Sequence, residues 1–162
     1  MKKVFIPALW FKSLSNYFDL FCTAIGLGKK YRKEVIRYLG SIKQDSRILD
    51  AGCGTGSLAT DLKQLNKTAQ IYGVDIDKDI LKLAERKRAR NNLEIIFECS
   101  PIQSLPYKPS SFDIVYSSLV MHHLKTEDKK IALREIHRVL KRGGYFLLAD
   151  FGKPSNLFSA PF

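Results

Sequence analysis

The chain has 162 residues, of which 45% are hydrophobic, and this suffices for one domain with a buried core. Its net charge of +11 suits nucleic acid or an anionic lipid surface as a partner. Cys22, Cys53 and Cys99 are too widely spaced for a zinc knuckle, a redox pair or a disulfide framework, and no apolar run approaches the roughly 20 residues of a membrane-spanning helix. We therefore expect no metal site and a protein of the reducing cytoplasm.

The chain opens on an apolar run over 4–11 that Lys12 ends, with no small-residue cleavage site after it, so we expect no signal peptide. Apolar residues at three- and four-residue steps then predict an amphipathic helix, which the glycines of 26–28 should end: Trp10, Leu14, Tyr17, Phe18, Phe21 and Ile25. We divide the chain into three parts. Residues 1–28 form an N-terminal helix that can act as a lid over a binding pocket, residues 29–154 form the core, and residues 155–162 form a short tail.

From Tyr31 onward, helical and extended patterns alternate, which is typical of a parallel sheet covered by helices. Five strands are expected, over 47–51, 70–75, 93–98, 112–117 and 145–150. Four helices are expected, over 31–39, 58–65, 78–88 and 127–140. Right-handed crossovers make this series a Rossmann-like, doubly wound α/β sheet.

The most informative local pattern is DAGCGTG over 50–56, which follows the first strand and opens the next helix. Its glycines remove side chains where the chain turns, so that a ligand can approach the backbone and the helix N-terminus. Asp75 ends the second strand 23 positions after Gly52, where a carboxylate can accept hydrogen bonds from both ribose hydroxyls of a nucleoside. We interpret Cys53 as a small side chain that packs within the turn rather than as a nucleophile.

Dinucleotide-binding dehydrogenases have a related pattern, but their Gly-x-Gly-x-x-Gly spacing requires a glycine where this chain has Ser57. Asp50, just before the turn, would repel a pyrophosphate. The same carboxylate suits a ligand that carries an ammonium and a sulfonium group. The pattern therefore disfavours a dinucleotide.

Three motifs in this order resemble those of class I S-adenosylmethionine (SAM)-dependent methyltransferases: LDAGCGTG at 49–56, FDIV at 112–115 and EIHRVLKRGG at 135–144. The likeness covers about 31–154, and DFGKP at 150–154 is most similar to the C-methyltransferases of ubiquinone and menaquinone biosynthesis. It implies SAM as cofactor, methyl transfer as activity and the strand order 3-2-1-4-5. Members of the family continue with antiparallel strands, which this chain is expected to lack.

The resemblance implies that the following residues surround the methionine and ribose parts of SAM: Asp50, Gly52, Cys53, Gly54, Thr55, Gly56, Asp75 and Ile76. In the family an acidic or amide residue followed by a small one binds adenine, and here that pair is Pro101 and Ile102. Because proline offers neither a side-chain acceptor nor a backbone donor, either Ser100 or Gln103 substitutes, or adenine is held by stacking and the Ile102 amide.

Ser117 and Ser118 end the fourth strand and are expected to line the methyl end of SAM. His122 and His123 follow and can assist proton loss from a phenol or a ring carbon, or alternatively cap and pack the following loop. This segment lacks the Asn/Asp-Pro-Pro-Tyr/Phe stretch of enzymes that methylate base amino groups. A small-molecule acceptor, such as a quinone precursor or a phenol, is therefore favoured.

Two alternatives stay open: a SAM-binding or interaction module without transferase activity, and an RNA methyltransferase. The basic runs 29–33 and 86–90 suit RNA, but they also read as solvated helix faces. The apolar run 145–149 is expected at a sheet edge, which predicts a homodimer joined through that edge or an aggregation-prone fragment. The N-terminal helix can also touch a membrane that carries a quinone precursor.

Overall fold

The computed structural model describes residues 26–151. The expected lid helix before Gly26 and the tail 155–162 lie outside the described residues. The strands are β1 (Arg47–Ala51), β2 (Gln70–Asp75), β3 (Ile95–Cys99), β4 (Phe112–Ser118) and β5 (Leu140–Ala149). The helices are α2 (Lys29–Tyr38), α3 (Ser57–Leu65), α4 (Lys78–Arg90) and α5 (Thr126–Val139), with a short 3-10 helix η2 (Met121–His123).

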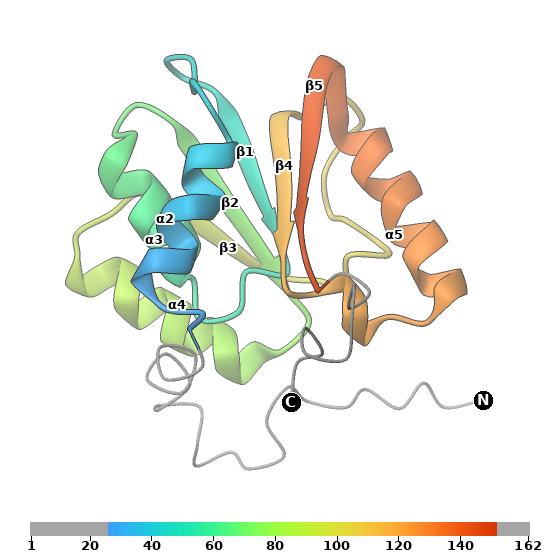
Figure 1. Ribbon diagram of the computed structural model, residues 1–162, viewed down its shortest axis with the longest axis horizontal. Coiled ribbons are helices and arrows are strands. Elements are labelled where there is room, and N and C mark those ends of the chain that lie inside the picture. Colours follow the sequence, from blue (N-terminus) through green and yellow to red (C-terminus); the bar gives the residue numbers. More distant parts are fainter. Residues whose placement is uncertain (1–25, 152–162) are drawn as a thin grey trace.

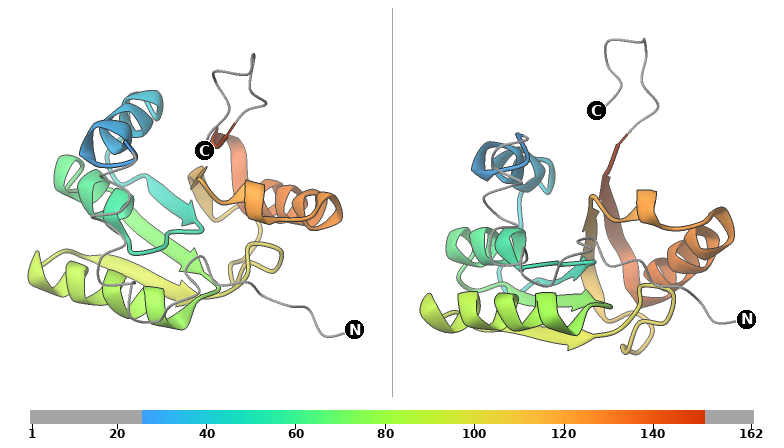
Figure 2. Two further views of the ribbon diagram at one scale, coloured as in Figure 1. Left: turned by 60° about the horizontal axis from the view of Figure 1, so that its bottom comes forward. Right: turned by 90° about the horizontal axis from the view of Figure 1, so that it is seen from below.

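The five strands form one parallel sheet in the order β3-β2-β1-β4-β5 (Figure 1). The predicted Rossmann-like sheet and its strand order are thus confirmed. Helices α2, α3 and α4 lie on one side of the sheet and α5 lies on the other (Figure 2). Because both faces are covered, β1 and β4 are almost wholly buried, as expected for the central strands of a parallel sheet.

Two layers of buried side chains hold these elements together. Toward α2 and α3 the layer is built around Ile48, Ile71 and Leu62, all at most 1% exposed. Toward α5 it is built around Phe112 and Ile136. At roughly 1.5 to 3 kcal/mol for each fully buried large apolar side chain, these layers supply most of the driving force for folding.

The strand register brings the carboxyl ends of β1, β2 and β4, which are far apart in the sequence, next to one another. β1 lies between β2 and β4, with Ala51 opposite Val74 and Asp50 opposite Tyr116. The carboxyl ends of these three strands are therefore neighbours, and ligands of doubly wound sheets bind at such an edge.

The fifth strand begins earlier than the sequence pattern predicted, at Leu140 instead of Tyr145, directly after α5. Its register with β4 shifts between Phe112 and Ile114, and Gly143 in this region has a φ of +80°. This irregularity allows the polar residues 141–144 to belong to the strand. A hydrophobic pattern alone does not predict a strand there.

β5 is an edge of the sheet, as predicted, and its exposed side chains include Tyr145 and Leu148. Among residues 26–151, no helix is long and apolar enough to cross a membrane.

Candidate functional site

The glycine turn after β1 is anchored to β2 by backbone hydrogen bonds. The amides of Gly52 and Cys53 both donate to the carbonyl oxygen of Val74, at 2.8 and 2.9 Å. The amide of Gly56 closes the turn by donating to the Cys53 carbonyl at 2.9 Å. The turn is thus a fixed extension of the sheet rather than a free loop.

The three glycines of the turn meet different surroundings. A Cβ on Gly52 would lie 2.4 Å from Val120 Cγ2, and one on Gly56 would lie 2.9 Å from the Cβ of Ala84 in α4. Gly54 has a φ of +53°, and apart from its chain neighbours no atom of the described residues lies within 4 Å of the position a Cβ would take. The turn is therefore packed at both ends and open in the middle, where a ligand can approach the backbone.

Asp75, at the end of β2, is joined to the open part of the turn. Its Oδ2 accepts a hydrogen bond from the Gly54 amide at 2.9 Å, and its Oδ1 accepts one from the Asp77 amide at 3.0 Å. Burial raises the pKa of Asp75, and these two hydrogen bonds oppose the rise. Each carboxylate oxygen can accept a further hydrogen bond, as two ribose hydroxyls would require. The structure thus brings together the two features that the sequence spacing predicted to meet.

Asp50 lies in the core, only 2% exposed, and its Oδ2 accepts a hydrogen bond from the Tyr116 hydroxyl at 3.0 Å. Burial raises its pKa from 3.8 to about 8; the Tyr116 hydrogen bond opposes the rise, and the charge of Asp75 adds to it. The carboxyl group offers a ligand almost no contact surface. Its effect on a cation at the turn is therefore electrostatic, and an approaching positive charge favours its ionised form.

The polar residues assigned to the methionine and methyl end of SAM are largely occupied by protein contacts. Ser117 is 1% exposed and donates to the Ala51 carbonyl at 2.8 Å, which ties β4 to β1. Ser118 Oγ lies 2.8 Å from the hydroxyl of Tyr31 in α2. Thr55 is buried, with its Oγ1 3.3 Å from Lys87 Nζ.

The loop after β3 carries the residues assigned to adenine. Ser100 is buried, and its hydroxyl donates to the Ser104 carbonyl at 2.6 Å, so it can accept from an adenine amino group but not donate. The Ile102 side chain is 5% exposed and packs in the core, whereas Ile76 is 46% exposed. Pro101, between Ser100 and Ile102 in the sequence, is partly exposed.

This loop is held on α5 by an Arg138–Glu135 pair. The Arg138 guanidinium donates to the carbonyls of Tyr107 and Leu105 at 2.7 and 3.0 Å, and Glu135 accepts from the Leu105 amide at 2.9 Å. Both side chains belong to the motif at 135–144. Part of that motif therefore positions the loop and need not touch a ligand.

His122 is fixed by Asp150, a residue the sequence analysis did not assign to the site. Asp150 Oδ1 lies 2.6 Å from His122 Nδ1, and Oδ2 accepts the His122 amide at 3.1 Å. The His123 ring is centred 3.9 Å from that of His122, and partial burial, followed by the charge of His122, lowers the pKa of His123. The available signal was an aspartate at the end of the predicted fifth strand, which the predicted strand order places beside the fourth.

The segment after β4 also covers the glycine turn. Leu119 adopts a left-handed conformation with a φ of +59°, and its amide donates to the Ala149 carbonyl at 2.8 Å. The following residue, Val120, packs on Gly52. A left-handed leucine costs roughly 1 to 3 kcal/mol, and such strain concentrates at functional sites.

Within residues 26–151, no group of three histidine, cysteine, aspartate or glutamate side chains is arranged to hold a metal ion.

A family model described as a methyltransferase domain matches residues 49–148. The chain is 31% identical over 130 residues to a ubiquinone/menaquinone biosynthesis C-methyltransferase of Bdellovibrio bacteriovorus, covering 80% of this chain and 54% of that protein. It is 34% identical over 149 residues to a protein of the same name from Wigglesworthia glossinidia brevipalpis, covering 89% of this chain and 58% of the relative. The chain thus spans little more than half the length of these relatives.

The fold is also similar to solved structures. A SAM-dependent methyltransferase from Aquifex aeolicus aligns with a TM-score of 0.75 at 20% identity, covering 94% of this chain and 79% of that one. The YcgJ protein of a Bacillus species aligns with a TM-score of 0.69 at 28% identity, covering 78% of this chain and 53% of that one.

Replacing Asp50 with asparagine should stabilise the protein at neutral and mildly alkaline pH. Because the folded pKa of Asp50 lies above the unfolded one, the native state binds more protons between pH 3.8 and about 8, and its stability falls as pH rises through that window. An asparagine side chain at this position would keep an acceptor for Tyr116 but carry no charge. At one pKa unit per ~1.4 kcal/mol, we expect the asparagine variant to gain roughly 1 to 3 kcal/mol at about pH 8 and little at about pH 4.

Thermal unfolding of both proteins at the two pH values measures this difference. An equal effect of Asp50→Asn at both, or a loss of stability at the higher one, would show that the buried carboxyl group does not titrate as described.

Proposed function

Because the chain belongs to the methyltransferase domain family, we propose that it is a SAM-dependent methyltransferase whose cofactor lies at the carboxyl ends of β1, β2 and β4. One observation carries this proposal: the open face of Gly54 adjoins the Asp75 carboxylate, to which its own amide is bonded. A backbone free of side chains and a ribose acceptor are the two elements that a nucleoside-containing cofactor needs in this fold.

In the proposed site the glycine turn and Thr55 hold the methionine part, and Asp75 holds the ribose. Ile76 and the 100–102 segment border the adenine, with Ser100 Oγ as acceptor for its amino group. Asp50 stabilises the cationic part through its charge. Ser117, Ser118 and Cys53 border these groups.

Binding of SAM tests the cofactor assignment, with Asp75→Asn as the informative variant. The amide removes the charge and one acceptor from the ribose site, so we expect binding to weaken by about 1 to 3 kcal/mol in titration calorimetry. Asp45→Asn is the matched control, because Asp45 is exposed before β1, at the other end of that strand.

Asp45 also has a left-handed φ of 58°, which asparagine tolerates equally well. The assignment fails if folded wild-type protein gives no heat with SAM at any salt concentration, or if the two variants weaken binding equally.

Bound SAM supplies a methyl group that is already activated by the sulfonium, so the protein needs mainly to align the acceptor and remove its proton. We assign proton removal to His122. Its Nδ1–H donates to Asp150, which leaves Nε2 as the ring atom that can take the acceptor's proton. Asp150 fixes the ring and stabilises the imidazolium that forms.

We propose a quinone precursor or a phenol as the acceptor. The names of the two relatives support this class, and such hydroxylated rings lose a proton on methylation at carbon or oxygen. A location in the cytoplasm fits the free thiols of Cys53 and Cys99.

A methyl-transfer screen with labelled SAM over quinone precursors, phenols and RNA tests this proposal. We expect transfer to the ring compounds, and a loss of about 100-fold or more in turnover for His122→Asn with SAM binding unchanged. His137→Asn, an exposed histidine on α5, is the control and should keep full activity. Transfer only to RNA would contradict the acceptor class, and an active His122→Asn variant would remove His122 as the base.

We also propose that two copies pair through the edge of β5. Its exposed apolar side chains support this: Tyr145 is 40% and Leu148 is 46% exposed. An unpaired apolar edge strand pairs readily with a second chain. Leu148→Lys should then convert a dimer to a monomer in light scattering, whereas Leu133→Lys, equally exposed at 46% on α5, should not. A monodisperse wild-type monomer at micromolar concentration would contradict this pairing.

A further inference from the structure

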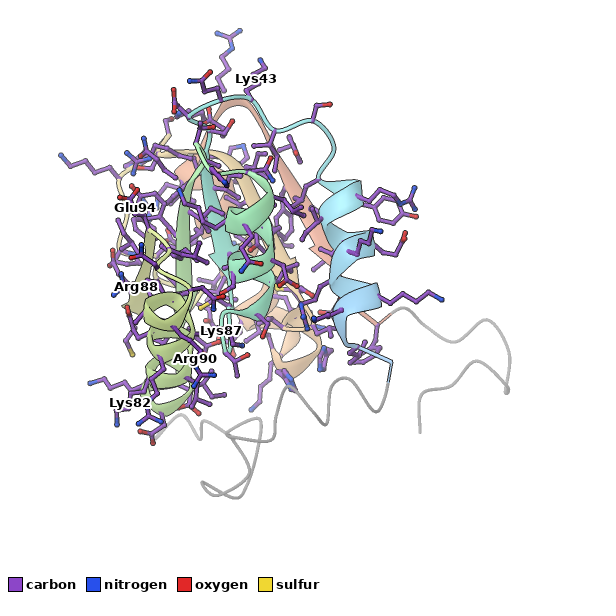
Figure 3. All side chains as sticks on the ribbon, turned by 90° about the vertical axis from the view of Figure 1, so that its left-hand side faces the viewer. Lys43, Lys82, Lys87, Arg88, Arg90 and Glu94 are labelled. Atoms are coloured by element: carbon purple, nitrogen blue, oxygen red, sulfur yellow. The ribbon has the colours of Figure 1, made fainter. Side chains whose placement is uncertain are left out.

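Helix α4 carries a row of exposed basic residues at intervals of four: Lys78, Lys82, Arg86 and Arg90. Neighbours in this row lie about 6 Å apart along the helix axis and about 40° apart around it, so the row winds gradually around the exposed side of the helix. The four cations therefore form a stripe about 18 Å long. Figure 3 looks at this side of the molecule, with Lys82 and Arg90 labelled on α4.

Acidic side chains neutralise little of the basic stripe. Lys82 pairs with Asp79 at 2.7 Å, and Glu85 pairs with Arg88, which lies beside the stripe, also at 2.7 Å. Within residues 26–151, no carboxylate lies within ion-pair distance of Lys78, Arg86 or Arg90. Three of the four cations are thus available to an anionic partner.

A groove of about 400 Å³ runs between the stripe and β3. Its basic and acidic walls come from α4, and its apolar lining comes from both elements: Lys78, Leu81, Lys82, Glu85, Arg86, Phe97 and Cys99. A groove with an apolar lining and a rim of three cations and one carboxylate fits a molecule with a hydrocarbon part and an anionic head.

The aromatic ring in this groove is poorly placed to stack on a nucleobase. A Cβ on Gly73 would lie 2.7 Å from Phe97 Cδ1, and one on Gly56 would lie 2.8 Å from Phe97 Cζ. The ring is thus packed against the backbone of β2 and the glycine turn. Single-stranded nucleic acid is usually held by exposed aromatic faces beside a basic track, and this groove does not offer one.

We propose that the α4 stripe and its groove dock the protein on the surface of an anionic phospholipid bilayer. The stripe meets the headgroup phosphates along its length, and the groove accepts apolar lipid segments between α4 and β3. A row of exposed basic residues along a helix suits a charged bilayer surface, where each basic residue strengthens binding electrostatically. This docking is independent of the proposed methyl transfer.

The docking surface ends beside the candidate cofactor site. Asp77, whose side chain accepts from the amides of Asp79 and Ile80, starts α4 two residues after Asp75. The groove reaches the ends of β2 and β3, where Cys99 Sγ contacts the Ile76 carbonyl at 3.6 Å. A docked bilayer therefore lies next to the residues that border the cofactor, and an apolar acceptor dissolved in it has a short path to them.

Flotation with vesicles of phosphatidylcholine, with and without phosphatidylglycerol, tests the docking. We expect the full chain to bind only the anionic vesicles, and the triple variant Lys78→Gln, Arg86→Gln, Arg90→Gln to bind about 100-fold more weakly. Glutamine keeps the helix propensity, so the variant should fold and bind SAM as the wild type does. A triple variant that binds vesicles like the wild type overturns the proposal.

The matched control removes the same charge from α2, as Lys29→Gln, Lys30→Gln, Lys33→Gln, all exposed. It should keep vesicle binding; equal losses in the two triple variants would show that net charge, not the stripe, is responsible. Binding of the wild type to single-stranded RNA but not to anionic vesicles would assign the stripe to nucleic acid instead.

An environment-sensitive dye on Cys99, in a Cys22→Ser chain, reports on the groove itself. Its emission should shift to the blue with anionic vesicles, and an unchanged spectrum during binding would exclude the groove from the contact.

Discussion

One carbonyl group, that of Val74, accepts hydrogen bonds from two successive amides of the glycine turn, and the rest of the site depends on this arrangement. The first bond continues the ladder between β1 and β2, in which Ala51 pairs with Val74. The second forces the chain to leave the strand direction at once, which requires residues that accept left-handed conformations. The turn then passes the next residue of β2, Asp75, and the Gly54 amide bonds to it. The pairing of two parallel strands therefore determines which carboxylate meets the turn.

The same geometry explains why an unfavourable group is retained in the core. Asp50 belongs to β1 and points to Tyr116 of β4, so it is desolvated by the strands that build the site. A carboxyl group with a pKa near 8 lowers the stability of the fold when it ionises. Buried ionisable groups with shifted pKa values are common at functional sites, where a ligand of opposite charge can stabilise them. A cationic ligand at the turn would offset the cost.

The sequence predicted the elements best where local pattern and tertiary environment agree. The bounds of β1 and β2 were predicted without error, because both are short, mainly apolar segments with a clear end, the glycine turn for β1 and Asp75 for β2. The start of β5 was wrong by five residues, since its first half is polar and depends on an irregular register with β4. The proximity of Gly54 and Asp75 was predicted, whereas the contact between His122 and Asp150 was missed. The predicted strand order places the ends of β4 and β5 side by side, but no motif spacing pairs these two side chains.

Charge is distributed unevenly over the molecule, and this reconciles a basic protein with a site for a cationic cofactor. The carboxyl edge of the sheet gathers Asp50, Asp75 and Asp77, whereas the exposed face of α4 presents Lys78, Arg86 and Arg90 without acidic partners among the described residues. With a screening length of about 8 Å at physiological salt, each surface acts mainly on what touches it. The acidic edge favours an ammonium or sulfonium group, and the basic helix favours phosphates. The two surfaces select ligands of opposite charge, so occupation of one does not compete with occupation of the other.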